Sequence, residues 1–89
     1  MKTYPTFMNG AYVGKCTLEE IKKWEGEARE IAIELMQKEK PDHIIYAYYS
    51  HDNSGEIDTA YLQILIKDET EFKRISKLPN YSICALHKR

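Results

Sequence analysis

Two segments in the middle of the chain, residues 42–51 and 56–67, are rich in aromatic and β-branched residues. Such residues fit the half-buried surface of a pleated strand. The polar sequence from Asp52 to Gly55 separates the two segments and has the composition of a tight turn. The pattern therefore predicts two strands paired as a hairpin.

A helical pattern precedes this hairpin. Thr17 and Glu20 have the spacing of a capping box, in which each side chain accepts a hydrogen bond from a backbone amide near the helix start. From Ile21 to Leu35, apolar residues recur every three or four positions, which places them on one helical face. Pro41 disfavours helical geometry in the residue before it. We expect one long amphipathic helix that ends before Pro41.

The remaining elements are short. Asn9-Gly10 is a strong two-residue hairpin signal, so residues 6–8 and 11–13 are expected to form paired strands. Apolar residues in 69–78 indicate a second, short helix, and residues 81–86 a last strand. We therefore predict a single α+β domain of residues 1–89 with a (ββ)αββαβ order of ferredoxin-like type. In that plan both helices cover one face of an antiparallel sheet.

The length of the central turn determines which tyrosines share a face, because a shift of one residue reverses every side chain. With two or four residues in the turn, Tyr49 shares a face with Ala60, and Tyr48 shares the other face with Tyr61. In the two-residue case Tyr48 lies opposite Tyr61 and Tyr49 lies opposite Ala60. With a three-residue loop, Tyr46 and Tyr48 join the aliphatic face, and Tyr49 joins Tyr61. We favour the first register because its cross-strand pairs are well matched in size and type.

Tyr61 is expected on the face without helices in both registers. In the favoured register that face also carries tyrosines and polar residues that could bind a partner. The candidate binding residues are Tyr46, Tyr48, Thr59, Tyr61 and Gln63.

The charge balance argues against a general nucleic-acid binder. Thirteen basic residues stand against fourteen acidic ones, for a net charge of −1. Nucleic-acid-binding domains usually have a clear excess of basic residues. The basic residues nearest the tyrosines in sequence are Lys67, Lys88 and Arg89, and nearby acidic residues oppose them. A charge near zero also favours self-association, so a homodimer is a second expectation.

The two cysteines, Cys16 and Cys84, form neither a redox motif nor a disulfide framework. We expect reduced thiols in a cytoplasmic protein. Cys16 stands just before the predicted long helix, where the helix dipole can activate a thiol, but an inert thiol is the more common case. No aliphatic run exceeds three residues and no signal-peptide pattern is present, so no membrane association is expected.

The sequence predicts no cofactor, metal ion or catalytic residue. His51 lies among Asp52, Glu56 and Asp58, but the spacing matches no calcium-binding loop. The N-terminal residues Tyr4-Pro5, Phe7–Gly10 and Tyr12–Gly14 resemble the proline-hairpin-helix portion of glutaredoxins, and Tyr12–Gly14 resembles the second motif of GIY-YIG nucleases. The redox dithiol and the first nuclease motif are missing. An Asn-Gly hairpin before a capped helix accounts for both resemblances, so neither family is assigned.

The sequence is most consistent with a non-enzymatic binding protein that recognises another protein. An adaptor would fit, as would a small inhibitor of a larger enzyme, of the kind that mobile elements make. One alternative is a nucleotide or single-stranded nucleic acid stacked on the tyrosines. The other is a degenerate nuclease or thiol enzyme.

Overall fold

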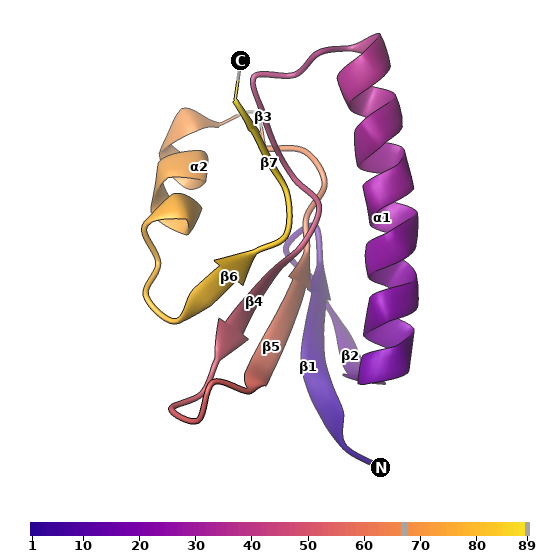
Figure 1. The fold of residues 1–89 in the computed structure, drawn as a ribbon, viewed down its shortest axis with the longest axis vertical. Helices are drawn as coiled ribbons and strands as arrows, with labels where there is room; N and C mark the ends of the chain where they lie inside the picture. The colour runs from indigo at the N-terminus through magenta and orange to yellow at the C-terminus, as the bar shows by residue number, and fades with distance from the viewer. Residues whose placement is uncertain (67, 89) are drawn as a thin grey trace.

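The computed structural model describes residues 1–66 and 68–88 and contains two helices and seven strands in that part of the chain (Figure 1). In chain order, the elements are β1 (Thr3–Met8), β2 (Ala11–Thr17), α1 (Leu18–Lys38), β3 (His43–Ile45), β4 (Tyr48–His51), β5 (Ile57–Leu62), α2 (Glu69–Ser76), β6 (Tyr81–Ile83) and β7 (Leu86–Lys88). The predicted α+β class is confirmed.

Five strands form a mixed sheet in the order β2-β1-β5-β4-β6. Strands β1 and β5 are parallel, whereas the other neighbouring pairs are antiparallel. Strands β3 and β7 form a separate antiparallel pair. The β3–β7 pair has the same register as the β4–β6 pair. Between the two pairs, the amide of Cys84 donates a 3.0 Å hydrogen bond to the carbonyl of Ala47. The two-stranded sheet is therefore a bent continuation of the main sheet.

The two helices lie on opposite sides of the strands (Figure 1). Tyr49 packs with Ile21 of α1, whereas its neighbour Tyr48 packs with Phe72 of α2. Successive residues of a strand point to opposite faces, so α1 and α2 cover different faces of the sheet. The prediction that both helices share one face was wrong, and so was the prediction of a purely antiparallel sheet.

The position of β2 explains this difference from the predicted plan. Because β2 occupies the edge beside β1, the last strand pairs instead with β4 at the other edge. The connections β2–α1–β4 and β5–α2–β6 both lead toward the β6 edge of the sheet. The strands that they leave, β2 and β5, run in opposite directions. Connections of this type are almost always right-handed, and two of the same hand place their helices on opposite faces. A ferredoxin-like arrangement is not confirmed.

The central hairpin has the register that we favoured. Tyr48 lies opposite Tyr61, and Tyr49 lies opposite Ala60. The Asp52 carboxylate accepts hydrogen bonds from the backbone amides of Ser54 and Glu56, at 2.9 and 3.0 Å. The register shifts next to the turn, so that His51 lies opposite Ile57.

A buried hydrogen bond joins α1 to the sheet. The Tyr49 side chain is only 3% exposed, and its hydroxyl donates to the Glu25 carboxylate. Lys22 forms an ion pair with the same carboxylate at 3.4 Å. Burial, together with the adjacent Glu25, raises the pKa of Tyr49. The folded state therefore favours the protonated phenol, and this contribution to stability is lost as the pH rises above about 10.

We expect Tyr49→Phe to lower the free energy of unfolding by about 1–2 kcal/mol at pH 7, because a hydrogen bond to a charged acceptor is lost. Urea denaturation followed by circular dichroism measures this change. The variant should also lose less stability than the wild type between pH 9 and 11. Tyr12→Phe, at an exposed position, is the control and should leave stability unchanged. Equal stability of Tyr49→Phe and the wild type would contradict the assigned hydrogen bond.

Candidate functional site: an aromatic row across the sheet

Five aromatic side chains, one from each strand of the main sheet, form a continuous row on the face that α2 partly covers. In spatial order they are Tyr12 of β2, Phe7 of β1, Tyr61 of β5, Tyr48 of β4 and Tyr81 of β6. The ring centroids of consecutive members are between 4.6 and 5.8 Å apart. We call this set the aromatic row.

Strand pairing aligns the row. Phe7 lies directly opposite Tyr12 in the N-terminal hairpin and directly opposite Tyr61 in the parallel pair. The hairpin turn at Asn9 and Gly10 has positive φ angles of 48° and 85°, the geometry that a tight two-residue hairpin requires. The turn thus fixes the register that brings Tyr12 beside Phe7.

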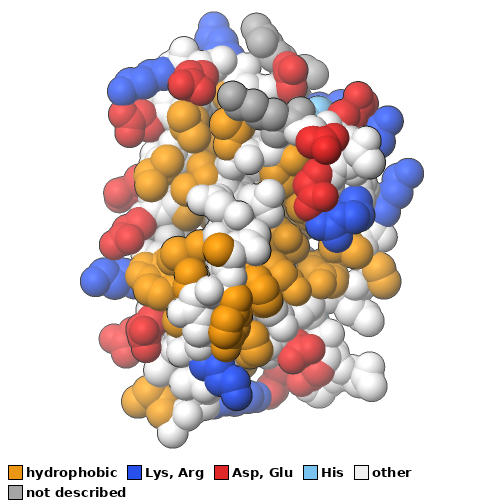
Figure 2. Space-filling model, turned by 180° about the vertical axis from the view of Figure 1, so that it is seen from behind, with side chains coloured by type: hydrophobic (Ala, Val, Ile, Leu, Met, Phe, Trp, Pro, Cys, Tyr) orange, Lys and Arg blue, Asp and Glu red, His pale blue; other side chains and the backbone are white. Residues whose placement is uncertain are grey.

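Exposure increases along the row toward β2. Tyr48 is 5% exposed beneath α2, and Phe7, Tyr61 and Tyr81 are half-buried. Tyr12, at the far end, is 57% exposed. The view from behind shows hydrophobic side chains gathered in a band across the molecule, with acidic and basic side chains above and below it (Figure 2). The open part of the row is therefore its β1–β2 end.

The rings stack mainly on one another. Tyr48 and Tyr61 are nearly parallel, with an angle of 6° between ring planes, and Phe7 and Tyr61 differ by 19°. Each inner ring therefore has a neighbouring ring against its face. The two end rings are tilted, Tyr12 at 56° to Phe7 and Tyr81 at 32° to Tyr48. A nucleic-acid base needs a free ring face, and the inner rings offer little of theirs.

Burial raises the pKa of the Tyr48 and Tyr61 hydroxyl groups above its usual value. The Tyr81 hydroxyl donates to the Tyr61 hydroxyl over 3.5 Å. Burial, with the neighbouring Tyr81, raises the pKa of Tyr61 to about 12. The row thus presents ring edges and hydroxyl groups, which suit a surface that is part apolar and part hydrogen-bonding.

The predicted binding residues have different locations. Tyr61 and Tyr48 both lie in the row, but Tyr48 is buried beneath α2 whereas Tyr61 is half-buried. Thr59 lies opposite Ser50 and is half-buried, and Gln63 follows the end of β5. The expected helix-free face is therefore only partly open.

Tyr46 lies on the other face, contrary to the expected arrangement. It packs against the α1 core, and its hydroxyl donates to the Cys84 carbonyl over 3.4 Å. The interruption between β3 and β4, at Tyr46 and Ala47, changes the alternation of side chains there. For the same reason Ile45 packs with α2 rather than with Ala47 and α1.

Sequence reasoning did not find Phe7, Tyr12 or Tyr81. The sequence did contain a signal that Phe7 and Tyr12 lie side by side, because both flank the Asn9-Gly10 turn at paired positions. Their place beside Tyr61 depends on the parallel pairing of β1 with β5, which no local pattern indicates.

Charges of both signs surround the row. Lys15 lies opposite Pro5 on β2, and Asp58 stands on β5. Near Tyr48, Arg74 is paired with Glu71 at 2.5 Å. Lys67 and Arg89, named above as possible basic neighbours, lie outside the described residues. Within the described part of the chain the row has no uniformly basic border.

The arrangement offers little for catalysis. Cys16 is buried in the α1 core. Side chains of His, Cys, Asp and Glu in the described ranges form no cluster of three or more that could hold a metal ion. His51 instead contacts the Ser82 hydroxyl at 2.7 Å and the Gly55 carbonyl at 3.2 Å.

Cys84 is the exposed cysteine, yet its surroundings suppress the thiolate. Burial of the thiol, followed by the negative charge of Glu25, raises the pKa of Cys84 to about 11. Nucleophilic cysteines require a lowered pKa, so this environment is the reverse of an activating one.

We expect iodoacetamide to alkylate Cys84 about tenfold more slowly at pH 8 than it alkylates a cysteine in an unstructured peptide. A pKa near 11 leaves about a hundredfold less thiolate, and the greater nucleophilicity of that thiolate offsets part of the loss. The rate, followed by mass spectrometry, should keep rising above pH 9.

Glu25→Gln should speed this alkylation, because it removes the negative charge beside the thiol. Glu30→Gln, an exposed neutralisation on the same helix, is the matched control and should not change the rate. A rate that levels off below pH 9 in the wild type would contradict the assigned environment.

No family model matches this chain, and neither does any curated protein or any solved structure. Among the described residues, neither helix combines the length and the hydropathy needed to cross a membrane.

Proposed function

We propose that this chain is a non-enzymatic binding protein that recognises a protein partner through the open end of the aromatic row. The observation that carries the proposal is the row itself, with Tyr12 exposed at its end and Phe7 and Tyr61 half-exposed beside it. Tyrosine is enriched at protein interfaces, where a rigid ring supplies apolar area and its hydroxyl supplies a hydrogen bond.

A protein partner fits this surface better than a nucleic acid does. The inner rings are stacked on one another, so bases would find few free ring faces. The mixed charge around Lys15 and Asp58 lacks the basic excess that binds phosphates. A protein partner needs neither free ring faces nor a basic border, so a protein surface of mixed charge fits the row.

The row can provide the centre of an interface but not all of it. A typical specific interface buries about 800 Å² on each partner, whereas one aromatic side chain contributes roughly 150–250 Å². The edge strand β2 adjoins the row, and the exposed Val13 on it can extend the contact. An adaptor, or an inhibitor of a larger enzyme, would use a surface of this size.

We expect Tyr12→Lys to abolish binding to the partner, because the substitution places a charge at the centre of the apolar contact. The matched control is Leu18→Lys, which makes the same exchange at an exposed residue at the start of α1. Capture from a native lysate, followed by binding of the purified partner, measures the effect. Circular dichroism checks that both variants remain folded.

Three outcomes would count against this proposal. Equal loss of binding in both variants would place the contact elsewhere. Salt-sensitive binding of a labelled single strand, reduced by Tyr12→Lys, would favour the nucleic-acid alternative. Sedimentation that shows only a dimer, dissociated by Tyr12→Lys, would assign the row to self-association.

A further inference from the structure

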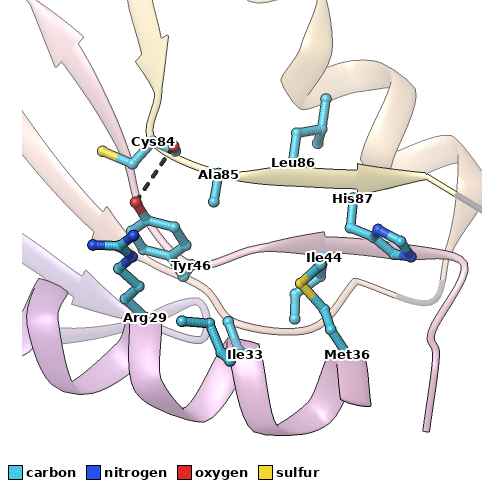
Figure 3. Close-up of a pocket in the computed structure, with 10 residues that line it drawn as sticks. Arg29, Ile33, Met36, Ile44, Tyr46, Cys84, Ala85, Leu86 and His87 are labelled. Atoms are coloured by element: carbon cyan, nitrogen blue, oxygen red, sulfur yellow. Dashed lines mark hydrogen bonds between the residues drawn. The ribbon is translucent and has the colours of Figure 1, made fainter.

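A groove of about 260 Å³ lies between α1 and the β3–β7 pair, separate from the aromatic row (Figure 3). Ala32 and Ile44 line it and are almost fully buried. Ile33 and Met36 also line it and remain 44% and 36% exposed. The groove therefore has an apolar floor and apolar walls that are open to solvent.

The groove is polar at its ends. Figure 3 shows Arg29 and Tyr46 at one end, and Met36 with His87 at the other. The Tyr46 hydroxyl is directed to the Cys84 carbonyl, and the Cys84 sulfur points away from the groove. One end thus presents a guanidinium group beside a phenol ring, and the middle presents aliphatic side chains.

The Arg29 guanidinium forms no ion pair with any described residue. Glu25, one helical turn earlier, is the carboxylate that the sequence spacing would pair with Arg29. In the structure Glu25 is instead engaged by Tyr49 and Lys22. A free guanidinium at the end of an apolar groove is complementary to a carboxylate that carries an apolar tail.

We propose that this groove binds a small aliphatic carboxylate, with its carboxylate at Arg29 and its tail along Ile33, Ile44 and Met36. The volume is slightly below the roughly 300–1,000 Å³ of typical ligand pockets, so the tail is of medium length. Arginine holds a carboxylate through two parallel hydrogen bonds, and the aliphatic walls remove the tail from water.

A second groove on the same helix provides an internal comparison. It has a volume of about 210 Å³ and lies between Trp24 and Ile31 of α1 and Ile64 near β5. Its charged lining residue is Glu27, which repels a carboxylate. If tail hydrophobicity alone determined binding, both grooves would take the same ligand, whereas a charge requirement selects the groove at Arg29.

The test uses three ligands with the same tail: octanoate, octanol and octylammonium. Amide chemical shifts in a nuclear magnetic resonance titration should move at residues 29–36 and 84–88 with octanoate. Octanol should bind the same residues about tenfold more weakly, and octylammonium should bind them weakest of the three. Equal affinity for all three ligands, or shifts centred on Trp24 and Ile64, would overturn the proposal.

Two variants separate the charge from the cavity. Arg29→Gln should weaken octanoate binding about tenfold and leave octanol binding unchanged, because only the carboxylate uses the guanidinium. Lys23→Gln, an equal loss of charge at another exposed position on α1, is the matched control. Ala85→Leu fills the groove and should weaken both ligands. An equal effect of Arg29→Gln and Lys23→Gln on octanoate would show general electrostatic attraction and overturn the site.

This site does not depend on the protein-binding role proposed for the aromatic row. Tyr12→Lys should leave the octanoate titration unchanged. Loss of octanoate binding in that variant would also contradict a separate site in the groove.

Discussion

The parallel pairing of β1 with β5 is the constraint on which the rest of the structure depends. It places β2 beside β1 at one edge of the sheet, and β6 pairs with β4 at the other edge. With both helical connections of the same hand, α1 and α2 then cover opposite faces. A small domain with a helix on each face buries both sides of its central strands, which explains why adjacent residues Tyr48 and Tyr49 are both buried.

Local features of this fold were predictable from the sequence. The capping box at Thr17, the Asn9-Gly10 turn and the register of Tyr48 with Tyr61 all depend on residues close in sequence or on matched pairs. The partner of β1 was not predictable, because the (ββ)αββαβ order is compatible with more than one strand arrangement. The ferredoxin-like plan assumed a purely antiparallel sheet, and the parallel pair of β1 with β5 departs from it and accompanies the different position of α2.

The candidate site was predictable in part for the same reason. The hairpin register correctly separated Tyr61 from Ala60 and Leu62, but the face that carries Tyr61 is partly covered by α2 and is not free of helices. Tyr46 was misplaced because no pattern of hydrophobic residues signals the interruption at Tyr46 and Ala47. Phe7 and Tyr12 were missed because their contact with Tyr61 runs through a parallel pair formed by residues more than fifty positions apart. Such pairings depend on the whole topology rather than on local sequence.

The bend that separates β3–β7 from β4–β6 occurs without an inserted residue in either strand, since the register is the same on both sides. The groove beside α1 therefore lies next to a bend that is made within two short junctions, 46–47 and 84–85, rather than by a longer loop. Ala85 lies in one of these junctions and also lines the groove, whereas Ala47 in the other junction is buried in the core. The same short junction of the chain therefore shapes both the groove and the course of the sheet.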